Sequence, residues 1–463
     1  MSTAVDATRG PLLRALVRLA APVVVMQACH TAFHLVNVMW VGRLGAASTA
    51  AVTTAFFLLW TIWAIADIAG VGTTATVARH VGAGERAQAG YAASQGALLA
   101  IVVGLAVTVA GWIGVAPLYS LIGTEPEVAR QAVGYLRILL GGAAISALYV
   151  WAESTMRAAG DTRTPLVVIA SSLALNAALD PLLIFGIGPF PRLGMAGAAI
   201  ATVVAQAFAV AWFASLALRR HPAFPLDRTA LRRFDPRYAF GLARIGVPYA
   251  LIGLLYSAVY LFFAHLAARF GTAAVAVVGV SNRIESVTYL VSAGFGLACE
   301  AIVGQNLGAR KADRAERAAW LSAALMAAFG SIMMIAMLAF PERLLGLFTS
   351  DPEVILTGVA YLRLLALSQA FTGVELVLNG AFSGAGDTVP PMAISTTLSL
   401  LRFPLAWYCV VPLGGGLVGL AIVITITSAL RTVILAAWFR RGAWRTKATL
   451  PEEPQPALAS PLS

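Results

Sequence analysis

Residues 157–165 read Arg157-Ala-Ala-Gly-Asp-Thr-Arg-Thr-Pro165, and their centre, Gly160-Asp161-Thr162, returns as Gly386-Asp387-Thr388 (386 − 160 = 226). The same offset relates other short stretches along the chain. Examples are Arg43-Leu44-Gly45 with Arg269-Phe270-Gly271, Pro126-Glu127-Val128 with Pro352-Glu353-Val354, and Tyr135-Leu136-Arg137 with Tyr361-Leu362-Arg363. A spacing kept through the whole chain predicts two structurally equivalent halves.

The composition indicates that these halves lie in a lipid bilayer. The 463 residues are 59% hydrophobic and 11% charged, and the mean hydropathy is +0.83, whereas soluble domains are about 25% charged. Apolar stretches of membrane-spanning length recur along the chain. They predict helical spans at 12–40, 47–78, 90–116, 129–157, 164–186, 195–218, 239–267, 272–304, 317–341, 354–381, 391–411 and 417–439. The fold predicted is an all-α integral membrane protein with twelve transmembrane helices in two pseudo-symmetric six-helix lobes. Two parallel repeats of this kind are typical of transporters.

The chain divides into four parts. We predict an N-terminal six-helix lobe at 1–218, a basic cytoplasmic linker at 219–238, a C-terminal six-helix lobe at 239–445 and a disordered cytoplasmic tail at 446–463. The tail is rich in Pro, Glu, Ser and Ala, a composition typical of disorder.

The net charge of +11 is explained by membrane topology, not by nucleic-acid binding. Arginines and lysines gather in the segments that share one side of the predicted bundle, namely the N-terminus, the loop at 79–89, the linker, the loop at 310–317 and the C-terminus. The positive-inside rule places such segments in the cytoplasm. We therefore expect a multi-pass protein of the plasma (inner) membrane with both termini cytoplasmic.

Polar side chains inside the spans are the candidates for function, because they are costly in lipid. His30, His34 and Asn37 follow one another at helical spacing and share a face of the first span. Asn176 and Asp180 share a face of the fifth span, and Thr202 lies in the sixth.

These motifs resemble the multidrug and toxic compound extrusion (MATE) family, in its DinF-like branch. The resemblance covers roughly residues 10–445 and rests on Val41-Gly42-Arg43-Leu44-Gly45, on the 157–165 stretch, on residues 176–186 and 194–202, and on Gly304-Gln-Asn-Leu-Gly308. It implies a V-shaped bundle that exports organic cations by alternating access, coupled to inward H⁺ or Na⁺. It also implies a transporter, not an enzyme, with Asn176, Asp180 and Thr202 at the coupling-ion site and Pro22 as the bending proline.

One position departs from the family pattern. Asn37 stands where the family usually has an Asp, so the site holds one carboxylate instead of two. This loss removes a charged ligand for Na⁺ and leaves burial as the main influence on the protonation of Asp180. We expect H⁺ coupling through Asp180, assisted by His34 as a titratable neighbour. Na⁺ at Asp180, Asn176, Asn37 and Thr202 stays open as the alternative.

The second half does not copy this cluster, since Asn176 and Asp180 become Arg402 and Ala406 at the same offset. Aromatic, methionine and acidic side chains are the candidates for a substrate cavity, because ring faces attract cations and Met adapts to varied shapes. The candidates are Met26, Tyr149, Tyr256, Tyr260, Phe263, Asp67, Glu285 and Glu375. The alternative for the glutamates is a structural ion pair with Arg283, Arg402 or loop arginines.

The residues disfavour two other function classes. A lipid-linked precursor flippase of the same wider superfamily is disfavoured, because the spans offer essentially Arg402 alone for a pyrophosphate. A membrane enzyme such as a prenyl transferase would need paired Asp-rich motifs for Mg²⁺. The expected partners are bilayer lipid, small organic cations and the coupling ion H⁺ or Na⁺, with no cofactor, no other metal and no nucleic acid. We expect a monomer.

Overall fold

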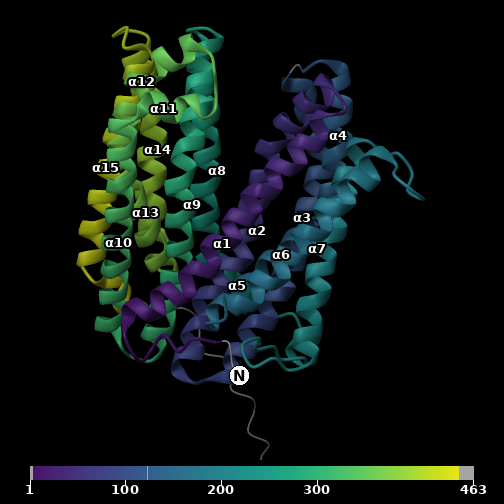
Figure 1. The fold of residues 1–463 in the computed structure, drawn as a ribbon. Coiled ribbons are helices and arrows are strands. Elements are labelled where there is room, and N and C mark those ends of the chain that lie inside the picture. Colours follow the sequence, from purple (N-terminus) through teal and green to yellow (C-terminus); the bar gives the residue numbers. More distant parts are fainter. Residues whose placement is uncertain (1–3, 123, 448–463) are drawn as a thin grey trace, which may run out of the picture.

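The computed structural model describes residues 4–122 and 124–447, and this part of the chain is helical without any strand. Two helix groups stand side by side and diverge toward one end, so that the molecule has the shape of a V (Figure 1). We call the end where the groups meet the closed end. The predicted all-α, two-lobe fold is confirmed.

The first lobe contains α1 to α7. Their bounds are α1 Leu12–Gly42, α2 Ala46–Ala83, α3 Arg86–Ile122, α4 Pro126–Gly141, α5 Ala143–Ala158, α6 Arg163–Phe185 and α7 Met195–Leu218. The second lobe contains α8 to α15. Their bounds are α8 Pro236–Ala268, α9 Thr272–Gly308, α10 Ala312–Ala339, α11 Pro341–Gly346, α12 Pro352–Ala366, α13 Gln369–Gly384, α14 Val389–Val410 and α15 Gly416–Arg440.

The internal repeat fixes where helices begin. The starts of α2, α4 and α6 recur at α9, α12 and α14 with the offset of the sequence repeat (272 − 46, 352 − 126 and 389 − 163 all equal 226). By length and hydropathy, nine helices of the described chain can cross a membrane, and two bent helix pairs raise the number to eleven. Helix α14, the repeat partner of α6, accounts for the remaining predicted span, at 391–411.

Two predicted spans are broken, which the sequence analysis did not predict. The span at 129–157 consists of α4 and α5, which meet at 54°, and the span at 354–381 consists of α12 and α13, which meet at 48°. The breaks fall at Gly142 and at Leu367-Ser368. Because they occupy similar places in the two halves, the bends belong to the repeated unit.

The lobes pack tightly at the closed end, where α2 of the first lobe crosses α9 of the second. A Cβ atom on Gly82 would lie 1.9 Å from the carbonyl oxygen of Gln305, and one on Gly308 would lie 1.8 Å from that of Arg79. The two contacts are related by the repeat (82 + 226 = 308 and 79 + 226 = 305). The crossing is therefore reciprocal, and only glycine allows the backbones this close.

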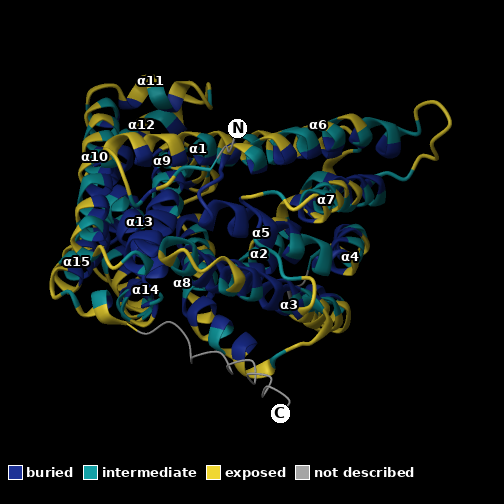
Figure 2. Cartoon of the chain, turned by 90° about the horizontal axis from the view of Figure 1, so that it is seen from below, coloured by how far each residue is buried: buried dark blue, intermediate teal, exposed yellow. Residues whose placement is uncertain are grey.

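Burial is most complete around this crossing. Seen from the closed end, buried residues concentrate where α2, α5, α9 and α13 meet (Figure 2). Each of these helices is buried on all sides over two turns or more, at 71–78, 151–158, 298–307 and 377–384. The contact between the lobes is thus a continuous helical core.

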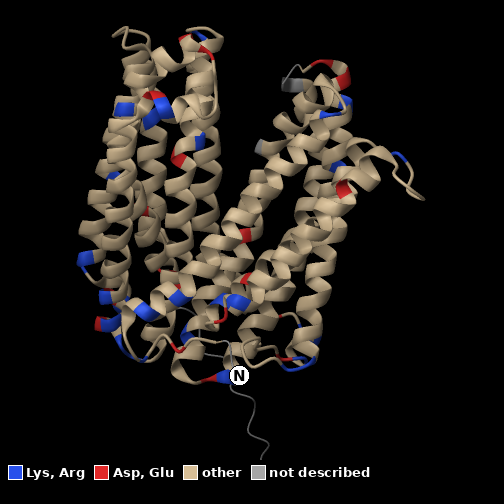
Figure 3. Cartoon of the chain, in the orientation of Figure 1, with Lys and Arg blue, Asp and Glu red and all other residues tan. Residues whose placement is uncertain are grey.

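Charged side chains mark the ends of the molecule. Few Lys, Arg, Asp or Glu residues lie at mid-height, whereas basic residues gather at the closed end beside the N-terminus (Figure 3). Helix α8 begins at Pro236, inside the range predicted as the linker, which also contains a short 3-10 helix at Ala230–Arg232. A second short 3-10 helix, Ala443–Thr446, follows α15. The predicted tail lies outside the described residues from 448 onward.

Candidate functional site

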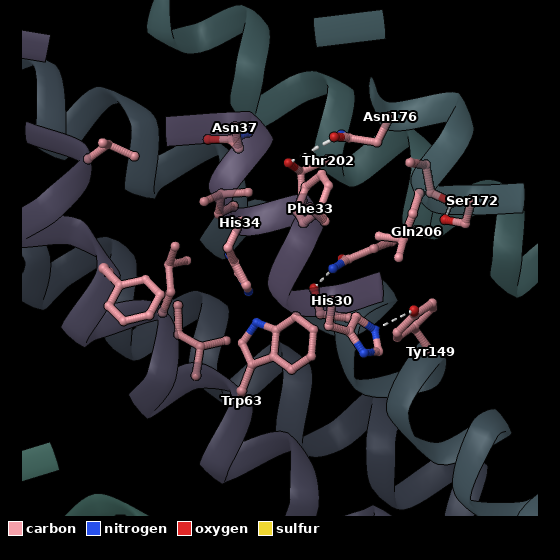
Figure 4. A pocket seen from close by; sticks show the side chains of 18 of the residues that line it. His30, Phe33, His34, Asn37, Trp63, Tyr149, Ser172, Asn176, Thr202 and Gln206 are labelled. Atoms are coloured by element: carbon pink, nitrogen blue, oxygen red, sulfur yellow. Dashed lines mark hydrogen bonds between the residues drawn. The ribbon is translucent and has the colours of Figure 1, made fainter. Parts of the chain in front are cut away.

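The polar residues singled out in the first lobe converge on one cavity. Asn37 of α1, Asn176 of α6 and Thr202 of α7 line it together with His34 (Figure 4). The Asn176 Nδ2 atom donates to Thr202 Oγ1 at 3.5 Å, and the Thr202 hydroxyl donates to the Ala198 carbonyl at 3.0 Å. Three helices separated in sequence thus bring together the amides and the hydroxyl that the sequence had grouped.

The cavity is small. Its volume is about 70 Å³, which holds a few water molecules, whereas sites for drug-sized ligands span roughly 300–1,000 Å³. Four polar lining residues were missed by the sequence analysis, because isolated hydroxyls and amides on apolar helices carry no motif. They are Tyr135, Ser146, Ser172 and Gln206. The arrangement suits a proton, a water cluster or a small cation.

Asp180 lies one helical turn from Asn176 and is fully buried. Asn37 is its neighbour, so Asp180 joins the same polar cluster without lining the cavity. Among the described residues, neither carboxylate oxygen of Asp180 has a hydrogen-bond partner, and neither does Asn37 Nδ2 or Asn176 Oδ1. Four buried polar atoms without partners are unusual, since such groups are almost always satisfied.

The two histidines of α1 also line the cavity. His30 Nε2 and the Tyr149 hydroxyl are 3.0 Å apart, and the His30 ring packs edge-on against Trp63. His34 packs against Phe56 and Trp63. Tyr149, predicted as a substrate contact, therefore belongs to the wall of this small cavity (Figure 4).

The candidate substrate residues of the second lobe divide into two groups. Tyr256 and Tyr260 join their hydroxyls at 3.1 Å, and Tyr256 stacks on Tyr289. Glu285 lies near Tyr260 and accepts a hydrogen bond from Gln369 Nε2 at 3.0 Å. Phe263 is 1% exposed within the core of the second lobe. Its prediction as a cavity residue is wrong.

Met26 is the second correction. Its side chain is 0% exposed and packs with Val23 and Ala69 in the largest apolar core of the first lobe. It therefore fills space between helices in this core. Pro22, on the same helix, lies within α1, which continues without interruption from Leu12 to Gly42. The hinge role of Pro22 stays a prediction.

Glu375 forms a buried ion pair. Its carboxylate accepts a hydrogen bond from Arg431 Nη1 at 2.8 Å, and both side chains are buried. The sequence analysis had proposed Arg283 or Arg402 as partners, which is wrong for Glu375. Arg402 instead donates to the hydroxyls of Thr427 and Ser428, at 2.8 Å each.

The Glu375–Arg431 pair gives a stability prediction. We expect Glu375→Gln to lower the free energy of unfolding by about 3–5 kcal/mol, because it leaves a buried guanidinium without its counter-charge. Thermal unfolding in detergent measures the effect. The double variant Glu375→Met/Arg431→Met removes both charges and should be markedly more stable than Glu375→Gln. Equal stability of Glu375→Gln and the parent would contradict the assignment.

Comparisons with known proteins agree with this geometry. A family model described as MatE matches residues 22–182 and again 248–408, and the two matches are separated by the repeat offset (248 − 22 = 226). A probable multidrug resistance protein NorM from Thermotoga maritima is 27% identical over 451 residues, covering 95% of this chain and 94% of the relative. An FAD transporter from Shewanella oneidensis is 29% identical over 448 residues, covering 95% and 97%.

A solved structure supports the fold. The outward-facing conformation of a multidrug resistance MATE family transporter of the MOP superfamily superposes with a TM-score of 0.87 at 25% identity, covering 96% of this chain and 98% of that chain. Members of this family are membrane proteins that move small organic substrates and are not enzymes. Since the family model covers both halves, the chain belongs to the MatE family of multidrug and toxic compound extrusion transporters.

Proposed function

We propose that the protein exports organic cations by alternating access, coupled to inward H⁺ bound at Asp180. The carrying observation is the fully buried Asp180 carboxyl group, which has no hydrogen-bond partner and no ion pair among the described residues. We further propose that the closed end faces the cytoplasm across the inner membrane and that the unit is a monomer. The basic residues at that end support this orientation.

A proton fits this site better than Na⁺. Burial disfavours an isolated carboxylate, and protonation removes the charge without any further ligand. The remaining groups, Asn37, Asn176 and Thr202, are neutral, so a bound Na⁺ would face a single formal charge. They are suited to hydrogen-bond a protonated acid. His34 lines the same cavity, and its proposed part is to pass a proton, because histidine titrates near neutral pH.

The substrate is proposed to bind away from Asp180, because the cavity there is too small for an organic cation. The partly exposed rings of Tyr256 and Tyr260, with the Glu285 carboxyl group beside them, offer π faces and a negative charge. That combination attracts quaternary and flat organic cations. Bending of α1 at Pro22, where the helix lacks one backbone hydrogen bond, would carry a change at Asp180 toward the contact between the lobes.

The test is transport by the purified protein in liposomes, followed with ethidium as the fluorescent cation. An imposed H⁺ gradient should drive ethidium movement against its own gradient, and dissipating the gradient with nigericin should stop it. An imposed Na⁺ gradient alone should drive none. Transport driven by Na⁺ alone would overturn the H⁺ assignment, and no ethidium movement under either gradient would overturn the organic-cation assignment.

Asn37→Asp should change the coupling ion. The variant restores a second carboxylate next to Asp180, and two carboxylates sharing a site bind a cation strongly when both are ionised. We expect ethidium transport in this variant to respond to an imposed Na⁺ gradient, to which the parent does not respond. The matched control is Asn282→Asp, which adds a carboxylate on α9, outside the cluster. An identical Na⁺ response in the two variants would contradict the site.

A second candidate, export of an anionic dinucleotide, is favoured by Arg402. This guanidinium is 3% exposed, and its hydrogen-bond partners are two neutral hydroxyls. Glu285 and Glu375 lie within electrostatic range of it, and an anionic group would add a charge-assisted hydrogen-bond partner. The relative from Shewanella oneidensis is named an FAD transporter. FAD should inhibit ethidium transport by the parent but not by Arg402→Met if this candidate holds. No inhibition of the parent excludes it.

A further inference from the structure

Three charged side chains meet at the contact between the lobes, separate from the Asp180 cavity, and a fourth lies within electrostatic range of them. Arg157 of α5 donates from Nη1 to Glu153 Oε1 at 3.0 Å and from Nη2 to Ser154 Oγ at 3.1 Å. The same Nη2 atom lies 4.0 Å from Glu300 Oε2 of α9, in the other lobe. Asp67 of α2 lies within electrostatic range of Glu153, Arg157 and Glu300. We call these four residues the interlobe acid cluster.

The charges of this cluster do not balance. When every group is ionised, the cluster has three carboxylates and one guanidinium, and its net charge is −2 (1 − 3 = −2). Glu300 is 1% exposed and Arg157 4%, and buried charges are costly unless each is paired. Arg157 bonds Glu153 closely but stands at the limit of ion-pair distance from Glu300. Within the described part of the chain, Glu300 Oε1 has no hydrogen-bond partner at all.

We propose that the interlobe acid cluster is a second proton-binding site, occupied while the lobes are in contact and emptied when they separate. Glu300 and Asp67 carry the exchangeable protons, and Arg157 is the fixed counter-charge that holds Glu153 ionised. Asp67 is the partly exposed member of the cluster, and the exchange of protons with water is assigned to it. The proposal deepens the proton coupling proposed above.

The location explains why this site responds to the movement of the lobes. Asp67, Glu153 and Arg157 belong to the first lobe, whereas Glu300 belongs to the second. It lies two turns before the Gly308 crossing, on the stretch of α9 buried on all sides. Separation of the lobes removes Glu300 from Arg157 and exposes its carboxyl group to water, where the ionised form is stable.

The other titratable groups around the cluster are tyrosines and more distant charges. Tyr249 of α8 faces Asp67, Glu300 and Arg157, and Tyr289 of α9 faces Asp67 and also Glu375, which is paired with Arg431. Tyr149 of α5 lies within electrostatic range of Glu153 and Cys29. Tyrosine hydroxyls keep their protons at neutral pH, so proton exchange falls to the carboxyl groups.

The sign of the pH dependence follows from this arrangement. The closed arrangement binds more protons than the separated one, so acid stabilises the closed end and alkali favours its opening. A proton taken up while the lobes are in contact would be released at the side where they open. In the orientation proposed above, that side is the cytoplasm.

The experiment measures the separation of the lobes without any substrate. Spin labels are placed on Arg86→Cys of α3 and Arg317→Cys of α10, which are exposed positions near the closed end on different lobes, with Cys29, Cys299 and Cys409 replaced by Ala. Double electron–electron resonance in lipid nanodiscs then gives the label distance as a function of pH. We expect a short distance in acid and a growing long-distance population as the pH rises.

The decisive variant is Glu300→Gln, which stays neutral at every pH. It should reduce the long-distance population at high pH by at least about tenfold. This is the factor by which one pH unit changes an equilibrium that releases one proton. Glu153→Gln is the second variant if Glu300→Gln does not fold, and it should likewise weaken the pH response, because the cluster loses one negative charge. The exposed Glu342→Gln is the matched control and should behave as the parent.

The outcomes separate this proposal from the function proposed above. A label distance that does not depend on pH in the parent, or an unchanged pH response in both Glu300→Gln and Glu153→Gln, overturns the second site. Asp180→Asn should keep the parent's response, because Asp180 lies outside the cluster. Loss of the response in Asp180→Asn alone overturns the second site but leaves Asp180 as the coupling residue. A retained response in a protein that transports with Na⁺ alone supports the cluster while contradicting the proposed coupling at Asp180.

Discussion

Asp180→Asn should abolish ethidium transport driven by an H⁺ gradient, reducing it to the level of protein-free liposomes. Asparagine has nearly the same shape as aspartate but cannot bind and release a proton. The side chain is fully buried between Asn37 and the polar residues of α6 and α7, so the packing should remain. We expect all of the H⁺-driven transport to be lost, because the site contains no second carboxylate that could bind the proton instead.

Two measurements distinguish lost coupling from lost folding. Exchange of labelled for unlabelled ethidium at equal pH requires alternating access but no net proton movement, and it should persist in Asp180→Asn. The thermal unfolding midpoint should be equal to or above that of the parent, because the variant removes a buried ionisable group without a partner. Glu342→Gln, on the exposed face of α11, is the control. Proton-driven transport at the parent's rate in Asp180→Asn would exclude Asp180 as the carrier.

Gly308→Ala should open the closed end. The added Cβ atom would lie 1.8 Å from the Arg79 carbonyl oxygen, far inside van der Waals contact, and neither helix backbone can yield locally. Forcing extra atoms into a packed contact costs about 1–3 kcal/mol, so the equilibrium should shift toward separated lobes by about fivefold or more. The label distance between positions 86 and 317 reports the shift, and ethidium transport should fall accordingly.

The same helix provides the control. A Cβ atom on Gly279 of α9 would meet nothing within 4 Å, so Gly279→Ala has the same helical propensity change without the collision. It should keep the parent's label distance and transport rate. If Gly308→Ala keeps them as well, the close crossing of α2 and α9 does not hold the lobes together.

The sequence predicted the helices well, because the information is local and repeated. Apolar stretches of spanning length and one constant offset located six spans per half, and the model places α2, α4 and α6 in register with α9, α12 and α14. The bends at Gly142 and at Leu367-Ser368 were missed, since each lies inside a continuous apolar stretch. Hydropathy gives the length of such a stretch but does not show where the helix axis changes direction.

The candidate site was predictable in part for a related reason. Asn37, Asn176 and Thr202 were grouped by the family resemblance and by helical spacing, and the model brings them together. Arg431 and Glu300 were not recognised as partners of Glu375 and Arg157. Helices that are apolar on every face carry little information about their rotation, so the sequence does not show which side of α9 or α15 faces a distant charge. Phe263 and Met26 were misplaced for the same reason.

The reciprocal crossing of Gly82 and Gly308 has a consequence for how readily the two lobes part. Where interdigitated leucines meet, separation has to unlock rotamers and wet a large apolar area. Here peptide backbone lies against peptide backbone, and the amide groups are already bonded within their own helices. At the two glycine contacts themselves, parting wets little hydrocarbon. The bond from Gln305 Nε2 of α9 to the Ala158 carbonyl of α5, at 2.8 Å, has to be exchanged for one to water. A contact built in this way can be close and still have a low energetic barrier to separation, and its position on the internal symmetry axis lets both lobes rotate about it equally.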